Sequence, residues 1–185
     1  MIRPWPSLRS AVVGDFRIFK IRQEMKRSPR TATCQDFFII DCANWVNVIA
    51  LTTDHHLVMV EQYRHGSNTV ELEVPGGVID PEDDSPMSAG ARELREETGY
   101  AGGEALMLGH VFPNPAIMNN TCYTVLIQNC RQRHETALDH GEDLITRLVP
   151  VHEIQSLIVA GKIRHAMVLV ALQLFEIWRK DSVGR

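Results

Sequence analysis

The 185-residue chain lacks an apolar run of the about 20 residues that a bilayer span requires. Its first ten residues lack the apolar core of a signal peptide. It also lacks a long run of lysine and arginine, and its net charge is −4, so a nucleic-acid backbone is a poor candidate for the main partner. We therefore expect a cytoplasmic protein that binds neither membranes nor nucleic acid.

Paired cysteines are also missing. Cys34, Cys42, Cys122 and Cys130 form no CxxC motif, which argues against a structural zinc site and favours a reduced, intracellular setting. A framework of disulfides is the alternative. Cys122 and Cys130 fit small core or edge residues better than redox-active ones.

The length suits one domain with a small appendage. We place the appendage at residues 1–43 and the main domain at residues 44–185. After an irregular arm of ten residues, residues 15–22 and 36–41 are expected to form two strands of a hairpin. An isolated hairpin is marginal, so a further surface should cover it, either the main domain or a second subunit.

The main domain alternates strand and helix signals. Residues 69–74 place Val70, Leu72 and Val74 on one face and Glu71 and Glu73 on the other. The remaining pattern predicts a mixed α/β sandwich. Its further strands are expected at residues 45–52, 56–64, 105–112, 122–128 and 143–149, and its later helices at residues 151–160 and 164–179.

A short helix is predicted after the acidic loop. Ser85 suits the N-cap, Pro86 the first helical position and Gly99 the position after the helix. At 100° per residue, its glutamates fall within an arc of roughly 100°. A hard divalent cation would explain such repelling neighbours, because Mg²⁺ takes oxygen ligands and usually bridges to substrate phosphates. The alternative is a solvated helix face rich in glutamate. The three glutamates are Glu93, Glu96 and Glu97.

This stretch resembles the Nudix box, GX5EX7REUXEEXGU, in which U is a bulky apolar residue. The first half departs from the pattern, because an aspartate replaces the first glutamate and the loop at residues 81–86 is one residue longer. We assign the first acidic role to neither Asp83 nor Asp84. The second half matches fully at Arg92, Glu93, Leu94, Glu96, Glu97, Gly99 and Tyr100.

The segments EQYR, ELEVPGG, NPAIMNN, GED and GKIRHAMVLVALQLF resemble the ADP-ribose pyrophosphatase and nucleoside-diphosphate-sugar hydrolase branch of that superfamily. The resemblance implies a Nudix-type α/β/α sandwich with a mixed sheet, plus an N-terminal antiparallel strand region. It also implies a homodimer across which that strand region is exchanged or packed. The implied cofactor is Mg²⁺, with Mn²⁺ as an alternative.

The resemblance assigns roles to the helix. Glu93 and Glu97 would be metal ligands, Glu96 a ligand or a base, and the carbonyl of Gly76 a further ligand. We interpret Arg92 as orienting the carboxylates in preference to touching the substrate.

Roles outside the helix are also implied. Glu142 is our candidate general base, with Glu135, Asp139 and Asp143 as competitors. Arg64 is our candidate for holding a phosphate or the distal sugar, and a structural ion pair with Glu71 or Glu73 is its alternative. Those two glutamates are expected to line the substrate cleft.

The predicted reaction is metal-dependent hydrolysis of the pyrophosphate in a nucleoside diphosphate sugar, with ADP-ribose as the first choice. The products would be AMP and ribose 5-phosphate. GDP-mannose and an oxidised nucleoside triphosphate are alternative substrates. A catalytically silent nucleotide-binding regulator is the alternative from another class.

Overall fold

The computed structural model describes residues 1–138 and 141–183. The chain forms two compact units, and each is described by itself. One comprises Met1–Asn44 with Phe112–Thr121, and the other comprises Trp45–Val111 with Cys122–Arg185. No helix in the described ranges is both long and apolar enough to cross a membrane.

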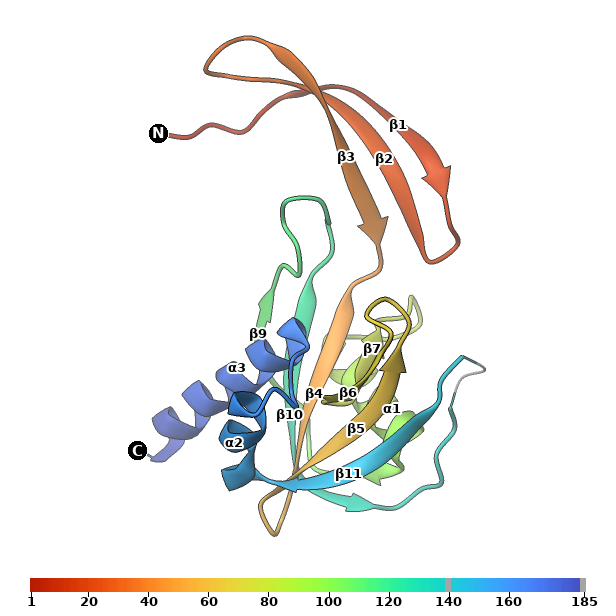
Figure 1. Cartoon of the computed structure of the whole chain (residues 1–185), viewed down its shortest axis with the longest axis vertical. Coiled ribbons are helices and arrows are strands. Elements are labelled where there is room, and N and C mark those ends of the chain that lie inside the picture. The colour runs from red at the N-terminus through yellow and green to blue at the C-terminus, as the bar shows by residue number, and fades with distance from the viewer. Residues whose placement is uncertain (139–140, 184–185) are drawn as a thin grey trace. The chain divides into compact units, whose positions relative to one another are not determined.

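The first unit is a three-stranded antiparallel sheet of β1 (Ser7–Asp15), β2 (Phe19–Arg27) and β3 (Cys34–Cys42) (Figure 1). The expected hairpin therefore has a third strand, and the expectation of an irregular arm over the first ten residues was wrong from Ser7 onwards. The apolar residues of β1 do not alternate, but its backbone pairs with β2. Residues 112–121 join β3 through a hydrogen bond of 2.7 Å from Ile40 N to Ile117 O.

The second unit is built on a mixed sheet whose central path runs β11-β5-β4-β10-β8. Strand β10 runs parallel to β4, whereas the other pairings are antiparallel, which confirms the mixed sheet. The strands are β4 (Trp45–Thr52), β5 (His56–Arg64), β6 (Thr69–Glu73), β7 (Gly76–Val78), β8 (Tyr100–Ala101), β9 (Leu106–Val111), β10 (Cys122–Gln132) and β11 (Leu144–Pro150).

Helices cover both faces of this sheet (Figure 1). Because side chains alternate along β4, Val48 packs with Leu94 on one face, and Ile49 packs with Phe175 on the other. Burying a large apolar side chain contributes about 1.5–3 kcal/mol, so both layers stabilise the sheet. The result is the expected α/β/α sandwich. Its helices are α1 (Pro86–Thr98), the 3₁₀ turn η1 (Val151–Glu153), α2 (Ile154–Val159) and α3 (Ala166–Val183).

The predicted caps of α1 are confirmed. The Ser85 hydroxyl accepts a hydrogen bond of 3.1 Å from Ser88 N, and Ser88 Oγ accepts one of 2.9 Å from Ser85 N. At the other end, Gly99 adopts φ 73° and its N–H bonds to Arg95 O at 2.9 Å. These two ends fix which residues of α1 face the sheet.

The four cysteines, all in described positions, are free. Cys122 and Cys130 are buried, as expected of small core residues, and burial raises the pKa of each thiol to about 11. Neither is therefore poised as a thiolate at neutral pH.

Candidate active site

The acidic stripe of α1 faces a small cavity of about 270 Å³. Strand β5 supplies two alternate residues of its lining, the turn after β6 supplies the glycines, and the segment before β11 supplies an acid. The lining residues are Gln62, Arg64, Gly76, Gly77, Val78, Asp80, Arg92, Glu93, Glu96, Glu97, Ala137 and Glu142. The structure thus brings together, from four parts of the chain, most of the site residues expected from the sequence.

Two of the helix glutamates are buried. The pKa of Glu93 is raised to about 7 and the pKa of Glu97 to about 8, mainly by burial, and the charge of Glu142 contributes to both increases. One oxygen of Glu97 accepts a hydrogen bond of 3.0 Å from Gly76 N, which ties α1 to the glycine turn. The bland alternative of a solvated glutamate-rich face does not describe these two side chains, because only 8% of Glu93 and 2% of Glu97 is exposed.

Arg92 lies among carboxylates. Its Nη1 donates to Glu93 Oε1 at 3.0 Å and to Glu96 Oε2 at 3.1 Å. Its Nε and Nη2 donate to Asp83 at 3.1 and 2.8 Å, and Nη2 also bonds to Val78 O. Hydrogen bonding to Asp83, more than any other contact, raises the pKa of Arg92. This geometry holds the helix carboxylates in fixed directions.

Asp83 belongs to the loop that is one residue longer than the Nudix pattern. Its Oδ2 also accepts a hydrogen bond of 2.9 Å from Asp80 N, so the loop folds back on the helix. The Arg92 guanidinium holds the pKa of Asp83 below its usual range. The sequence left this residue without a role, and the structure shows that it anchors Arg92.

The glycine turn brings the backbone close to its neighbours. Gly76 has φ 156°, and a Cβ there would collide with the carbonyl oxygen of Val46. A Cβ on Gly77 would lie 2.6 Å from Glu93 Oε1. Gly76 is therefore needed for β7 to pair with β4, whereas a Cβ at position 77 would displace the Glu93 carboxylate.

Strand β6 presents its glutamates inward, whereas Val70 of the same strand is 61% exposed. The expected core face of this strand was therefore wrong at Val70, because Glu71 and Glu73 are buried against cations. Glu71 accepts hydrogen bonds from Thr69 and from Arg164, and these lower its pKa, the bond from Thr69 most. Glu73 is paired with Arg64, so the structural alternative for that arginine is realised.

A larger cavity of about 890 Å³ adjoins the small one. The two share Arg64 and strand β7. Glu71 and Glu73 line the larger cavity and not the small one. Its other lining residues are Trp45, Val46, Asn47, Gly66, Ser67, Thr69, Val74, Cys122, Arg164, His165, Ala166 and Met167.

The donors of the small cavity fit a divalent metal ion. Within the described ranges, no group of three or more His, Cys, Asp and Glu side chains is arranged to hold an ion as it stands. Even so, Glu93, Glu96 and Glu97 line one cavity, and two of them have pKa values raised by burial. A nearby cation favours the charged form of such carboxylates, and oxygen donors suit Mg²⁺ or Mn²⁺.

The candidate base lies in this cavity. Glu142 lines it, whereas its competitors Glu135 and Asp143 are exposed and do not. Asp139, the third competitor, lies outside the described residues. Position therefore favours Glu142 over the two competitors that can be compared.

Gln62, Asp80, Arg164 and His165 are among the lining residues that the sequence analysis missed. Gln62 could have been found, because it is two residues before Arg64 and side chains two apart on a strand share a face. Asp80 belongs to the same irregular loop as Asp83. Arg164 and His165 gave no signal, since their partners are more than 90 residues away.

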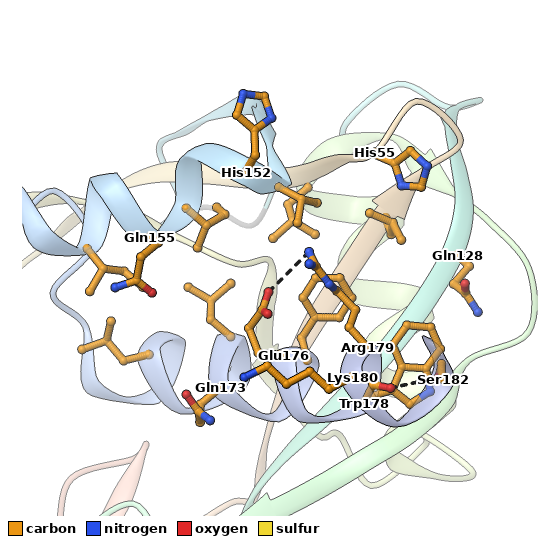
Figure 2. A pocket seen from close by; sticks show the side chains of 18 residues that line it. His55, Gln128, His152, Gln155, Gln173, Glu176, Trp178, Arg179, Lys180 and Ser182 are labelled. Carbon is orange, nitrogen blue, oxygen red and sulfur yellow. Dashed lines mark hydrogen bonds and ion pairs between the residues drawn. The ribbon is translucent and has the colours of Figure 1, made fainter. Parts of the chain in front are cut away.

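A third cavity, of about 810 Å³, lies between α2, α3 and the sheet (Figure 2). Among its described lining residues Glu176 is the one carboxylate, and it pairs with Arg179 at 3.4 Å. Phe175 stacks with Trp178 and also lies under Arg179. None of the residues expected to act in catalysis lies here, so this cavity is separate from the acidic one.

The chain is similar to known proteins in both sequence and fold. The NUDIX domain family model matches residues 44–169. ADP-ribose pyrophosphatase of Mycobacterium tuberculosis (strain ATCC 25618 / H37Rv) is 24% identical over 156 residues, which cover 84% of this chain and 75% of that protein. Methanol dehydrogenase activator of Bacillus methanolicus is 27% identical over 133 residues, 71% of each chain. A crystal structure of ADP compounds hydrolase matches with a TM-score of 0.86 at 21% identity, covering 98% of this chain and 97% of that one.

The family match spans well over half of the chain, and the structural match shows a shared fold. The chain therefore belongs to the NUDIX domain family and is a Nudix hydrolase.

Proposed function

We propose that the protein hydrolyses the pyrophosphate of a nucleoside diphosphate sugar, with ADP-ribose as the first choice, in a reaction that depends on Mg²⁺ or Mn²⁺. The observation that carries this proposal is the adjacency of the two cavities. A small acidic cavity suits a metal-bound diphosphate, and the larger one is big enough for a nucleoside or a sugar. The relative from Mycobacterium tuberculosis, which is named for the same reaction, supports it.

In this proposal, some residues bind the metal and others position the metal-binding carboxylates. Glu93, Glu96, Glu97 and the backbone carbonyl of Gly76 would hold the metal. When bound, that metal neutralises phosphate charge and lowers the pKa of water. Arg92 keeps two of the carboxylates in place through the hydrogen bonds described above.

Glu142 takes the proton of the attacking water. The water oxygen bonds to one phosphorus, the bond from that phosphorus to the bridging oxygen breaks, and the second phosphate leaves with the bridging oxygen. Hydrolysis of ADP-ribose in this way gives AMP and ribose 5-phosphate. Arg64, whose Nη1 makes no hydrogen bond to the described residues, would hold a phosphate oxygen across the shared wall of the two cavities.

The first unit supports a second proposal, that two copies of the chain associate through its sheet. Large apolar side chains lie exposed on β1, on β3 and in the turn between β1 and β2, and exposed apolar surface of this kind suits association with a partner. We propose a homodimer in which the three-stranded sheet of each copy packs against the other copy. The exposed residues are Leu8, Val12, Val13, Phe16, Ile18 and Phe38.

A substrate panel tests the proposed activity. The purified protein is incubated with ADP-ribose, GDP-mannose, other nucleotide sugars and an oxidised nucleoside triphosphate, with Mg²⁺ or with EDTA. We expect metal-dependent turnover with preference for a nucleoside diphosphate sugar. Preference for the triphosphate would overturn the substrate class, and turnover of none would favour the silent regulator.

A further inference from the structure

The buried carboxylate of Glu73 links the start of α3 to the active-site arginine. Arg64 donates from Nε to Glu73 Oε1 at 2.8 Å and from Nη2 to Oε2 at 3.0 Å. On the other side, His165 Nδ1 lies 2.6 Å from the same Oε2. The hydrogen-bonded series His165–Glu73–Arg64 therefore runs from the residue just before α3, through β6, to β5.

The charge of Glu73 determines which group donates in each of these hydrogen bonds. Although burial opposes it, hydrogen bonds from His165 and Arg64 lower the pKa of Glu73 to about 2, so this carboxylate is ionised at neutral pH. An ionised carboxylate only accepts hydrogen bonds, so His165 carries its hydrogen on Nδ1 and donates it. Glu73 is only 2% exposed, which leaves little water to replace either donor.

The bonds to Glu73 also settle how Arg64 can act. They occupy the Nε–Nη2 edge of its planar guanidinium, which leaves the Nη1 end for a ligand. Arg64 lines both cavities, and 41% of its side chain is exposed. A long side chain with that freedom needs a fixed partner if it is to meet a phosphate in one orientation, and a carboxylate held from one side only could rotate.

We propose that His165 is a positioning residue for the reaction: it holds Glu73 so that Glu73 presents the Arg64 guanidinium to a substrate phosphate. The inference rests on the proposed function, because it assumes that Arg64 binds phosphate. His165 itself does not touch the reacting atoms.

Arg164 provides an internal comparison. It is adjacent to His165, lines the same larger cavity and pairs with the next inward-facing glutamate, Glu71. Its ion pair ties the segment just before α3 to β6 in the same way, but no hydrogen bond connects Glu71 to Arg64 among the described contacts. If these residues served only to anchor α3, Arg164 and His165 would have the same role. Only His165 is connected through its glutamate to Arg64, so only His165 can position that arginine.

Steady-state kinetics with ADP-ribose and Mg²⁺ separate the two roles. We expect His165→Ala to raise KM about tenfold with kcat within about threefold, because a charge-assisted hydrogen bond to the binding group is lost. His165→Asn, whose amide can donate from a place close to that of Nδ1, should restore most of the loss. His165→Gln, with its donor one methylene farther out, should not, and it serves as a second variant if the alanine variant folds poorly.

Coupling to Arg64 gives the decisive comparison. In an Arg64→Lys background His165→Ala should have little further effect on KM, whereas any effect of Arg164→Ala should persist. Equal effects of His165→Ala in both backgrounds, or equal coupling of Arg164→Ala, would overturn the proposal.

A nuclear magnetic resonance readout needs no activity. The Arg64 Nε–H signal, assigned by its loss in Arg64→Lys, should shift or broaden in His165→Ala and stay unchanged in Arg164→Ala. An unchanged signal in His165→Ala would contradict the positioning role. If the wild type hydrolyses no member of the panel but the signal responds as expected, the proposed function fails and the His165–Glu73–Arg64 linkage stands.

Discussion

At the scale of single residues, the site is a set of buried carboxylates that differ in what neutralises them. Glu73 lies between two cationic or hydrogen-bonding partners, and its pKa is low. For Glu93 and Glu97, the cost of burying the charge exceeds what their hydrogen-bond partners offset, and their pKa values are high. We interpret Glu73 as a structural and positioning group, and Glu93 and Glu97 as the proposed metal ligands.

This difference predicts distinct responses to metal. Mg²⁺ should raise the Tm of the wild type, because a ligand that binds only the folded state stabilises it. Glu97→Gln should lose that increase and lower kcat by about 10²-fold or more, since a ligand is gone. Its amide oxygen can still accept from Gly76 N, so its fold should persist.

Glu142→Gln is the matched control. It should keep the Mg²⁺-dependent rise in Tm and still lower kcat by about 10²-fold, because general-base catalysis contributes that much. Thermal melts with and without EDTA, read beside kcat, check both variants. Full activity of the Glu97→Gln variant would show that Glu97 is not a metal ligand.

The low pKa of Glu73 predicts a pH-dependent stability. A carboxyl group whose pKa is lower in the folded state stabilises the protein above its unfolded pKa, near 4.5, and loses that contribution as the pH falls toward about 2. Glu73→Gln should therefore lower the free energy of unfolding at pH 7, and the difference from wild type should shrink steadily below pH 4.5. Urea unfolding across this range measures it, and a difference independent of pH would show that the charge of Glu73 contributes nothing.

At the scale of elements, helix α1 is the part that could be predicted most fully. Its caps at Ser85 and Gly99 and the spacing of its glutamates are local properties, so the sequence alone defined its ends and its acidic stripe. The longer loop before it could not be predicted, because the partner of Asp83 is Arg92, nine residues away across a turn of irregular geometry. Strand β1 was missed for a similar reason, since it is defined by its pairing with β2 and not by its own pattern.

The C-terminal cap of α1 gives a prediction at this scale. Gly99→Ala should lower the free energy of unfolding by about 1–2 kcal/mol, the cost of left-handed backbone for an alanine, and by more if the chain cannot yield. Its new Cβ would collide with the carbonyl oxygen of His134. Gly66→Ala, where a Cβ meets nothing within 4 Å, should change stability by less than about 0.5 kcal/mol. Chemical denaturation compares the two, and equal losses would contradict this role of the cap.

At the scale of the whole molecule, the α/β/α sandwich followed from alternation along the strands and from the resemblance to the Nudix pattern. The inward direction of Glu71 and Glu73 did not follow. Their inward direction depends on Arg164 and His165, which lie more than 90 residues away, and on Arg64 of the neighbouring strand β5. Local alternation distinguishes two faces of a strand but does not say which face meets a cation.

The exposed sheet of the first unit predicts the state of association. Light scattering should give twice the chain mass of 20.9 kDa. Phe38→Glu should shift the protein toward monomer, because a charge would be buried at the proposed interface. Val159→Glu, which alters an exposed apolar residue on α2, should leave the dimer intact. A monomeric wild type would defeat the dimer proposal.

The central claim is that the acidic cavity and its larger neighbour together cleave the pyrophosphate of a nucleotide sugar. The most direct measurement is chromatographic identification of products from ADP-ribose with wild-type protein, Mg²⁺ and an EDTA control. The account predicts equal amounts of AMP and ribose 5-phosphate that appear only with the metal. Intact ADP-ribose, or cleavage that continues in EDTA, would contradict it.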